Sequence, residues 1–147
     1  MPRRYLIIIC IVILICIPVL FIPFTTTVVP TWKLRVIDTD GNSCANKQVN
    51  QGWGHYSLEI EGDIGGSEYR FTDSEGYVEF HERTIRASLI WRVVAPGIAF
   101  LQAIIAHGSM GISGYVFSTG MKDGPFINYK PGKPLPEKII VDRCKYE

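Results

Sequence analysis

The stretch "FTDSEGYVEF" (Phe71–Phe80) indicates the fold class of this 147-residue chain. Asp73 and Gly76 stand at the first and last positions of the segment D-S-E-G, where β-turns favour these residue types. After the turn, Val78 and Phe80 alternate with residues that face the other way, which is the period-2 pattern of a half-buried strand. The stretch therefore predicts a hairpin corner between two strands, rather than an acidic site.

Further strands are predicted on both sides of this corner, because alternating or β-branched residues recur between turn residues. The predicted strands are "WKLRVID" (32–38), "KQVNQGW" (47–53) with "HYSLEIE" (55–61), "TIRASLIWRVV" (84–94), "SGYVFSTG" (113–120) and "KIIVD" (138–142). This spacing of short strands indicates an all-β protein, and we expect a β-sandwich of about seven strands.

One short helix interrupts the strand pattern in "APGIAFLQAIIAHG" (95–108). Pro96 suits the first turn of a helix and Gly108 suits its end, so we expect a helix of about ten residues. Its polar face holds only Gln102 and His107. A thin polar face favours burial on the sheet, or contact with another chain, over a position at the membrane surface.

The N-terminus predicts a single transmembrane helix. Tyr5–Phe24 contains no charged residue, and 20 helical residues span roughly 30 Å, the thickness of the hydrocarbon core. Arg3 and Arg4 precede this segment. By the positive-inside rule the N-terminus stays in the cytoplasm and the domain lies outside.

A cleaved signal peptide is the alternative, but its apolar core would be shorter and followed by small residues. Cys10 and Cys16 each follow isoleucine, whereas a lipidation signal requires a small residue there. We therefore expect an uncleaved anchor over residues 1–24, a linker over 25–31 and one folded domain over 32–147.

The charge of the domain excludes a basic nucleic-acid-binding surface. The 15 basic residues less Arg3 and Arg4 leave 13 against 14 acidic ones, so the net charge is close to zero. Cys44 and Cys144 bracket the domain and could form a disulfide in an oxidising compartment. Two unpaired, partly buried thiols are the alternative, and the sequence leaves both open.

Two stretches resemble a known family. "LRVIDTDGNSCANKQV" (34–49) and "YRFTDSEGYVEFHERTIRASL" (69–89) resemble transthyretin-like (prealbumin-like) and carboxypeptidase regulatory-like domains, where T-D-x-x-G-x-x-x-F joins two strands. The resemblance covers roughly Trp32–Asp142 and implies a transthyretin-like β-sandwich. Its nearest likeness is to small bacterial membrane-tethered or exported domains. Together with the predicted transmembrane helix, this likeness predicts a single-pass protein of the cytoplasmic (inner) membrane with a periplasmic, extracytoplasmic domain.

The enzymatic branch of that family, hydroxyisourate hydrolase, carries a histidine in its first strand and a C-terminal Y-R-G-S. Here Arg35 stands at the first position and the tail reads "RCKYE" (143–147). We therefore expect a non-enzymatic binding or structural module of the cell envelope. The alternative is a small-molecule hydrolase with a divergent site, which requires His55, His81 and the pair Arg83 and Arg86 to converge.

The candidate binding residues are Arg83, Arg86, His81, His55 and Trp53. Arginine forks bind carboxylates, so the arginines suggest an acidic partner; cross-strand ion pairs are the alternative. The chain is also rich in aromatic residues, which would suggest carbohydrate or peptide binding if exposed on one face, or else a sandwich core. The aromatic residues concerned are Trp53, Tyr56, Tyr69, Tyr77 and Trp91.

We expect neither a metal nor a cofactor. The three histidines match no local metal motif, and the D-x-D-x-N pattern of Asp38, Asp40 and Asn42 lacks the later residues of a calcium loop. The expected partners are the membrane, through Tyr5–Phe24, and an envelope protein, with no nucleic acid.

Overall fold

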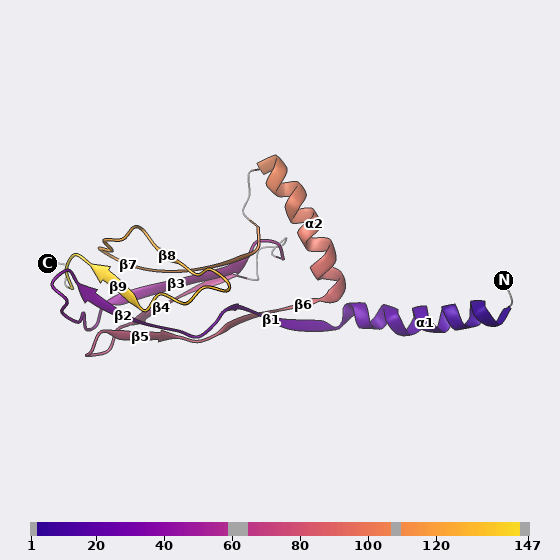
Figure 1. Cartoon of the computed structure of the whole chain (residues 1–147), viewed down its shortest axis with the longest axis horizontal. Coiled ribbons are helices and arrows are strands. Elements are labelled where there is room, and N and C mark those ends of the chain that lie inside the picture. The colour runs from indigo at the N-terminus through magenta and orange to yellow at the C-terminus, as the bar shows by residue number, and fades with distance from the viewer. Residues whose placement is uncertain (1–2, 59–64, 107–109, 145–147) are drawn as a thin grey trace.

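The computed structural model describes residues 3–58, 65–106 and 110–144, and this part of the chain is mostly β, as predicted (Figure 1). Two helices, α1 (Arg3–Phe21) and α2 (Leu89–Ala106), accompany the strands. The strands are β1 (Pro23–Val29), β2 (Trp32–Asp38), β3 (Gln48–His55), β4 (Gly66–Phe71), β5 (Tyr77–Phe80), β6 (Arg83–Ser88), β7 (Ile112–Ser118), β8 (Ile127–Asn128) and β9 (Lys138–Val141).

The strands form three sheets around one core. Their orders are β1-β6, β5-β2-β9 and β4-β3-β7-β8, and every pair is antiparallel except β2 with β9. Buried side chains from all three sheets belong to a single apolar cluster: Val28, Val29, Trp32, Leu34, Val36, Val49, Val78, Phe80, Ile85, Ala87, Val116, Ile139 and Val141. Burial of this shared cluster is what holds the sheets together.

The predicted turn at residues 73–76 is present. The Asp73 carboxylate accepts hydrogen bonds from the backbone N–H groups of Glu75 (2.9 Å) and Tyr77 (2.8 Å). Gly76 has φ 83°, and a Cβ there would lie 2.7 Å from the Val36 carbonyl oxygen. A left-handed backbone angle in so close a space requires glycine.

The prediction of a hairpin at this turn is wrong, although both strands exist. β4 pairs with β3 and β5 pairs with β2, so the chain passes from one sheet to another at the turn. Local sequence indicates a turn and two strands, but the strands' pairing partners are set by distant residues.

The prediction of a linker over residues 25–31 is also wrong. Most of this segment belongs to β1, which pairs with β6, and its residues Val28 and Val29 are fully buried. Threonine and valine favour strands, and β1 removes a free edge from β6. The folded part of the chain therefore begins with β1 rather than at residue 32.

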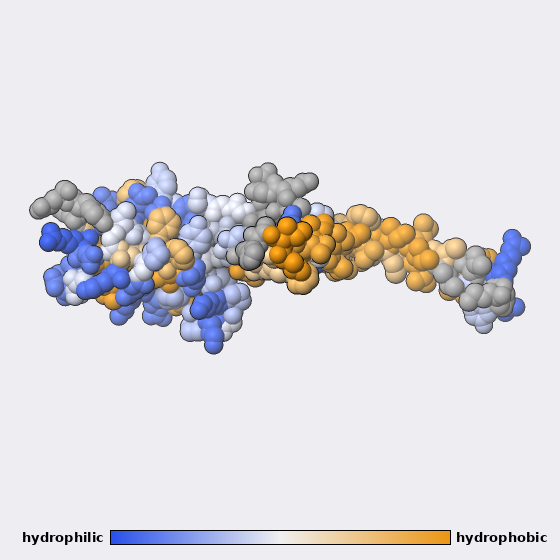
Figure 2. All heavy atoms as spheres, turned by 90° about the horizontal axis from the view of Figure 1, so that it is seen from above, coloured by the Kyte–Doolittle hydropathy of each residue, from blue (hydrophilic) through white to orange (hydrophobic). Residues whose placement is uncertain are grey.

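Helix α1 is long and apolar enough to cross a membrane, and none of it is buried by the rest of the chain. The helix ends at Phe21, earlier than the predicted Phe24, because β1 begins at Pro23. Figure 2 shows this apolar rod extending from a mostly hydrophilic β-rich part.

Helix α2 is longer than predicted. The strand expected over 84–94 stops at Ser88, and the helix begins at Leu89 rather than near Pro96, which lies inside it. The Ser88 hydroxyl accepts a hydrogen bond from the Trp91 N–H (3.3 Å), which caps the first turn. His107 lies outside the described residues.

The expected burial of this helix holds for only one of its sides. Ala95 and Ala99 are buried, whereas Leu101 and Ile105 are 60% and 81% exposed. Four-residue spacing places the two alanines on one face, and Ala95 on that face belongs to the core cluster.

Candidate functional site

The outward face of the sheet β4-β3-β7-β8 carries aromatic side chains. Asn50 in β3 lies opposite Tyr69 in β4 and Phe117 in β7, and directly opposed residues share a face of a sheet. Two residues further along the ladder, on the same face, Gln48 lies opposite Phe71. Tyr69 is 62% exposed and Phe71 is 53% exposed. Two rows of rings therefore flank amide side chains on a surface open to solvent.

A hollow of about 410 Å³ lies on the same side of β7. Its lining combines aromatic rings with small polar groups: Tyr56, Ser113, Tyr115, Phe117, Pro125, Phe126 and Asn128. Tyr115 stacks on Phe117 with ring centroids 6.3 Å apart and meets Phe126 at 5.7 Å. These ring contacts fix the shape of the hollow.

Gly52 determines where the Tyr115 ring lies. The two residues are opposed in the ladder, and a Cβ on Gly52 would come within 2.4 Å of the Tyr115 ring. Because no side chain stands at residue 52, the Tyr115 ring occupies the space over the β3 backbone at that position. The hollow therefore depends on a glycine that sequence patterning marks only as a strand breaker.

The described outward positions of this sheet carry no charged side chain. On its strands they hold Gln48, Asn50, Gly52, Gly54, Ser67, Tyr69, Phe71, Ser113, Tyr115, Phe117 and Asn128. Flat rings beside amide and hydroxyl groups suit a neutral ligand with both apolar faces and hydrogen-bonding groups. We call the rings and amides on these positions, together with Tyr56 and Phe126, the aromatic face.

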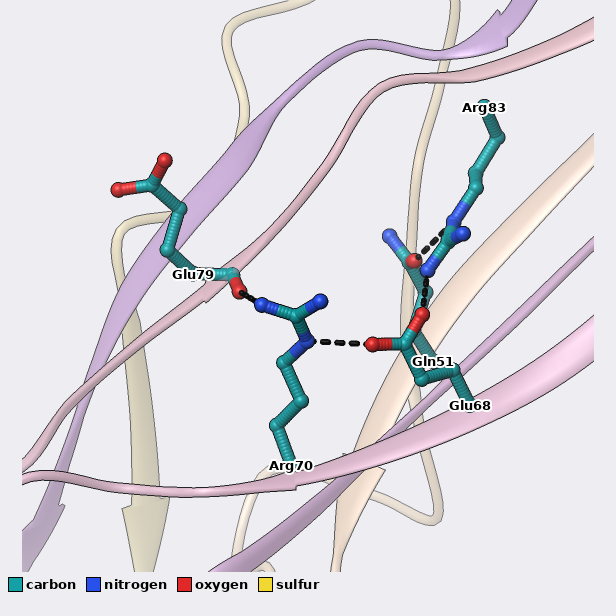
Figure 3. A network of polar contacts seen from close by, with 5 residues as sticks. All are labelled: Gln51, Glu68, Arg70, Glu79 and Arg83. Atoms are coloured by element: carbon teal, nitrogen blue, oxygen red, sulfur yellow. Dashed lines mark hydrogen bonds and ion pairs between the residues drawn. The ribbon is translucent and has the colours of Figure 1, made fainter.

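The opposite side of β4 and β3 holds a network of polar side chains (Figure 3). The Glu68 carboxylate pairs with both Arg70 and Arg83. Arg83 also donates from Nε to the Gln51 side-chain oxygen (3.3 Å), and Arg70 donates to the Glu79 carbonyl (3.1 Å). One carboxylate thus pairs with two guanidinium groups, and the network ties β6 and β5 to β4.

Arg83 also packs on an aromatic ring. Its guanidinium carbon lies 4.1 Å from the ring centroid of Trp53, a cation–π contact. Partial burial lowers the pKa of Arg83 from its usual value, although the group stays charged near neutrality. With its donors directed at Glu68 and Gln51, this arginine acts as an internal cross-link.

Of the predicted site residues, Arg83 and Trp53 contact each other. Arg86 is exposed on β6, and the exposed His81 lies between β5 and β6. His55 is half-buried at the end of β3, two residues after Trp53, whereas His81 precedes Arg83 by two residues. Since β3 and β6 both run toward α2, the two histidines lie in opposite directions from the Arg83–Trp53 contact (Figure 1).

The predicted aromatic residues separate into two groups. Tyr56 and Tyr69 belong to the aromatic face. Trp53 lies against the core, Trp91 donates its ring N–H to the Leu58 carbonyl (3.2 Å), and Tyr77 lies under Lys33 and Arg35 on another sheet.

Sequence reasoning missed four rings of the aromatic face, those of Phe71, Tyr115, Phe117 and Phe126. The signal was present in "GYVFS" (114–118), where Tyr115 and Phe117 flank the buried Val116. Period-2 alternation places these two rings on the side away from the core.

Cys44 and Cys144 are joined in a disulfide, with Cα atoms 4.8 Å apart. Cys44 is fully buried, and Cys144 packs against the core cluster. The bond attaches the C-terminal segment to the connection between β2 and β3.

Asp38, Asp40 and Asn42 form a turn. The Asp38 carboxylate accepts hydrogen bonds from the N–H groups of Asp40 (3.0 Å) and Asn42 (2.8 Å). Hydrogen bonds from Asn42 lower the pKa of the Asp38 carboxyl, and the bond from the Asn42 side chain has the largest effect. Over residues 3–58, 65–106 and 110–144, no three His, Cys, Asp or Glu side chains gather as metal ligands would.

Comparison with known proteins provides no relative for this chain, because no family model, no curated protein and no solved structure matches it.

Proposed function

We propose that this protein is a membrane-anchored binding module of the cell envelope and that its aromatic face binds a neutral carbohydrate chain. In this proposal α1 crosses the cytoplasmic membrane, with Arg3 and Arg4 on the cytoplasmic side. The β-rich domain then lies in the periplasm. The Cys44–Cys144 disulfide supports that placement, since such bonds persist in oxidising compartments.

A transthyretin-like β-sandwich is the fold that we propose for the domain. The sheets β5-β2-β9 and β4-β3-β7-β8 contribute to one shared core, as the two layers of a sandwich do. Each of these sheets then has one face directed away from the core, and the aromatic face is the outer surface of the second.

The observation that supports carbohydrate binding most strongly is that the aromatic face is rich in rings and uncharged. Sugar rings present C–H groups that pack on aromatic rings, and their hydroxyl groups bond amides such as those of Gln48, Asn50 and Asn128. A peptide that joins a sheet as an extra strand needs a free strand edge. The rings and amides of the aromatic face instead project from the broad surface of the sheet. The absence of charge on the described outward positions disfavours an acidic or basic partner.

The test is binding of a panel of neutral oligosaccharides to the full chain in lipid nanodiscs. Tyr115→Ala and Phe117→Ala should each weaken binding about fivefold or more, because a buried aromatic contact is worth about 1 kcal/mol or more. Tyr77→Ala, on the other large sheet, is the matched control and should leave affinity unchanged. Equal affinity of all variants, or binding only of envelope proteins or peptides, would contradict the proposal.

The membrane topology has its own test. A reporter that is active only outside the cytoplasm, fused after Glu147, should be active in cells and should fractionate with the membrane. Reporter activity in the soluble periplasmic fraction would instead indicate cleavage before the domain, and a reporter inactive in every fraction would place the domain in the cytoplasm.

The hydrolase alternative gains no support from the described residues. A general base and a substrate-binding arginine must reach the same reacting group, and the two histidines lie in opposite directions from Arg83. Arg83 itself is engaged by Glu68 and Gln51.

A further inference from the structure

We infer that α2 lies in the plane of the membrane interface, with its outer face inserted among the lipids of the leaflet from which the domain emerges. The inference rests on the proposed anchoring by α1 and names a second contact with the same bilayer. The occupant of this face is the phospholipid bilayer itself, including its anionic headgroups.

The outer face of α2 is almost entirely apolar and open. The exposed large apolar side chains on this helix are Leu89, Ile90, Val93, Val94, Ile98, Phe100, Leu101, Ile104 and Ile105. An exposed apolar surface of this extent on one helix marks a contact with a membrane or with another protein. The inner side, with Ala95 and Ala99, is buried, and Ala95 belongs to the core cluster. The side that would be polar in an isolated interfacial helix is therefore covered by the rest of the chain.

Helix α2 begins at the point where α1 ends. Pro23, two residues after α1, pairs in the β1–β6 ladder with Ser88, the residue before α2. Arg92 holds this junction together by donating hydrogen bonds to the carbonyl oxygens of Phe24 (2.6 Å) and Ala87 (3.2 Å). If α1 crosses the membrane, these contacts place the first turn of α2 at the membrane surface.

The apolar surfaces of the two helices adjoin. Residues of α1 and α2 contact each other, and Figure 2 shows the apolar atoms of α2 continuing into those of α1. Lipid that surrounds the end of α1 therefore also reaches the start of α2. This continuity favours the bilayer over a separate protein partner as the occupant.

The connections of α2 prevent it from crossing the membrane. The helix follows β6 and is followed by β7, and both strands contribute side chains to the same core. A spanning helix would separate them by the thickness of the bilayer. In Figure 1 the helix instead runs at a steep angle to α1, along the end of the domain.

The charge around the junction also suits a lipid surface. Neither Arg3–Val29 nor Arg83–Ala106 contains an aspartate or glutamate, whereas Arg86 and Arg92 lie at the membrane-facing end. Arginines close to a bilayer are attracted to anionic headgroups, and no acidic side chain in these segments opposes that attraction.

The test measures the depth of single probes on the full chain. Leu101→Cys and Ile105→Cys are each labelled with an environment-sensitive fluorophore, in a chain carrying Cys10→Ala and Cys16→Ala, without reductant so that the disulfide stays intact. Ile15→Cys in α1 reports the span and Phe71→Cys on β4 reports the solvent, and all four positions are exposed in the structure. Vesicles of neutral and anionic phospholipid contain bromine at defined depths.

We expect the α2 probes to be blue-shifted, shielded from aqueous iodide, and quenched best by bromines about 5–10 Å below the headgroups. Ile15 should be quenched by deeper bromines and Phe71 by iodide alone. Iodide quenching at Leu101 and Ile105 equal to that at Phe71 would overturn the inference. Protection of both from iodide and bromine alike would also overturn it, because a second copy or another protein would then cover the face.

These results distinguish the position of α2 from the proposed anchoring by α1, on which it rests. If Ile15 is in lipid while the α2 probes are in water, α1 anchors the chain and only the position of α2 is wrong. If Ile15 itself lies outside the lipid, the anchoring fails and the inference fails with it.

Discussion

Removal of the disulfide by the double substitution Cys44→Ala and Cys144→Ala should strongly destabilise the domain. The bond joins residues that are 100 apart in sequence. In the chain-entropy description, a loop of this length stabilises the folded state by about 4–5 kcal/mol. Since domains of this size are stable by only about 5–15 kcal/mol, the loss is a large part of the total.

The assay is urea unfolding of the full chain in nanodiscs, followed by tryptophan fluorescence, to which the fully buried Trp32 contributes. With a denaturant dependence of about 2 kcal/mol per molar urea, the midpoint should fall by roughly 2 M. The control replaces Cys10 and Cys16, which are exposed on α1, with alanine and should leave the midpoint unchanged. If the double variant unfolds at the same urea midpoint as the control, the disulfide does not stabilise the folded domain and the reasoning is refuted.

Three further perturbations address the turns and the polar network. Gly76→Ala should cost about 1–3 kcal/mol, because it combines a left-handed backbone angle with a backbone clash, and an unchanged melting temperature would count against the turn geometry. Glu68→Gln should cost about 1–2 kcal/mol in urea unfolding, because it removes the carboxylate that neutralises Arg83, and full stability would show that the network contributes little. Because hydrogen bonds lower the pKa of Asp38 below 3.8, its stabilising effect is present above that pH and is lost as the pH falls through the folded-state value. The stability difference between the natural chain and Asp38→Ala should therefore shrink in acid unfolding below pH 3.8, and a difference that is constant with pH would contradict this role.

Local sequence patterns predicted the strands and turns of this fold better than they predicted which strands pair with each other. The alternation around Val78 and Val116 identified strands, and Asp73 with Gly76 identified a turn, because these signals depend on neighbouring residues. Strand pairing was harder to predict: the Thr/Val segment of β1 resembles a linker until β6 provides the other half of its ladder. The apolar run after Ser88 fits a strand or a helix equally well, and only tertiary packing decides between them.

In the candidate site, too, individual residues could be predicted from the sequence but their contacts could not. Arg83 and Trp53 were selected by residue type, but the sequence did not show that they touch, nor that Glu68 from the neighbouring strand β4 pairs with Arg83. Predicting the aromatic face would require the strand register that places Asn50 between Tyr69 and Phe117. No pattern within a single segment contains that register, since it joins three separate parts of the chain.

The most direct measurement is a chemical-shift map of the full chain in nanodiscs, with labelled tyrosine and phenylalanine rings, during titration with a neutral oligosaccharide that binds. We predict that Tyr69, Tyr115, Phe117 and Phe126 shift together and saturate at one affinity, while Tyr77 stays unchanged. Shifts confined to Tyr77, or saturable binding that leaves the rings of the aromatic face unperturbed, would contradict the assignment of this face as the binding site.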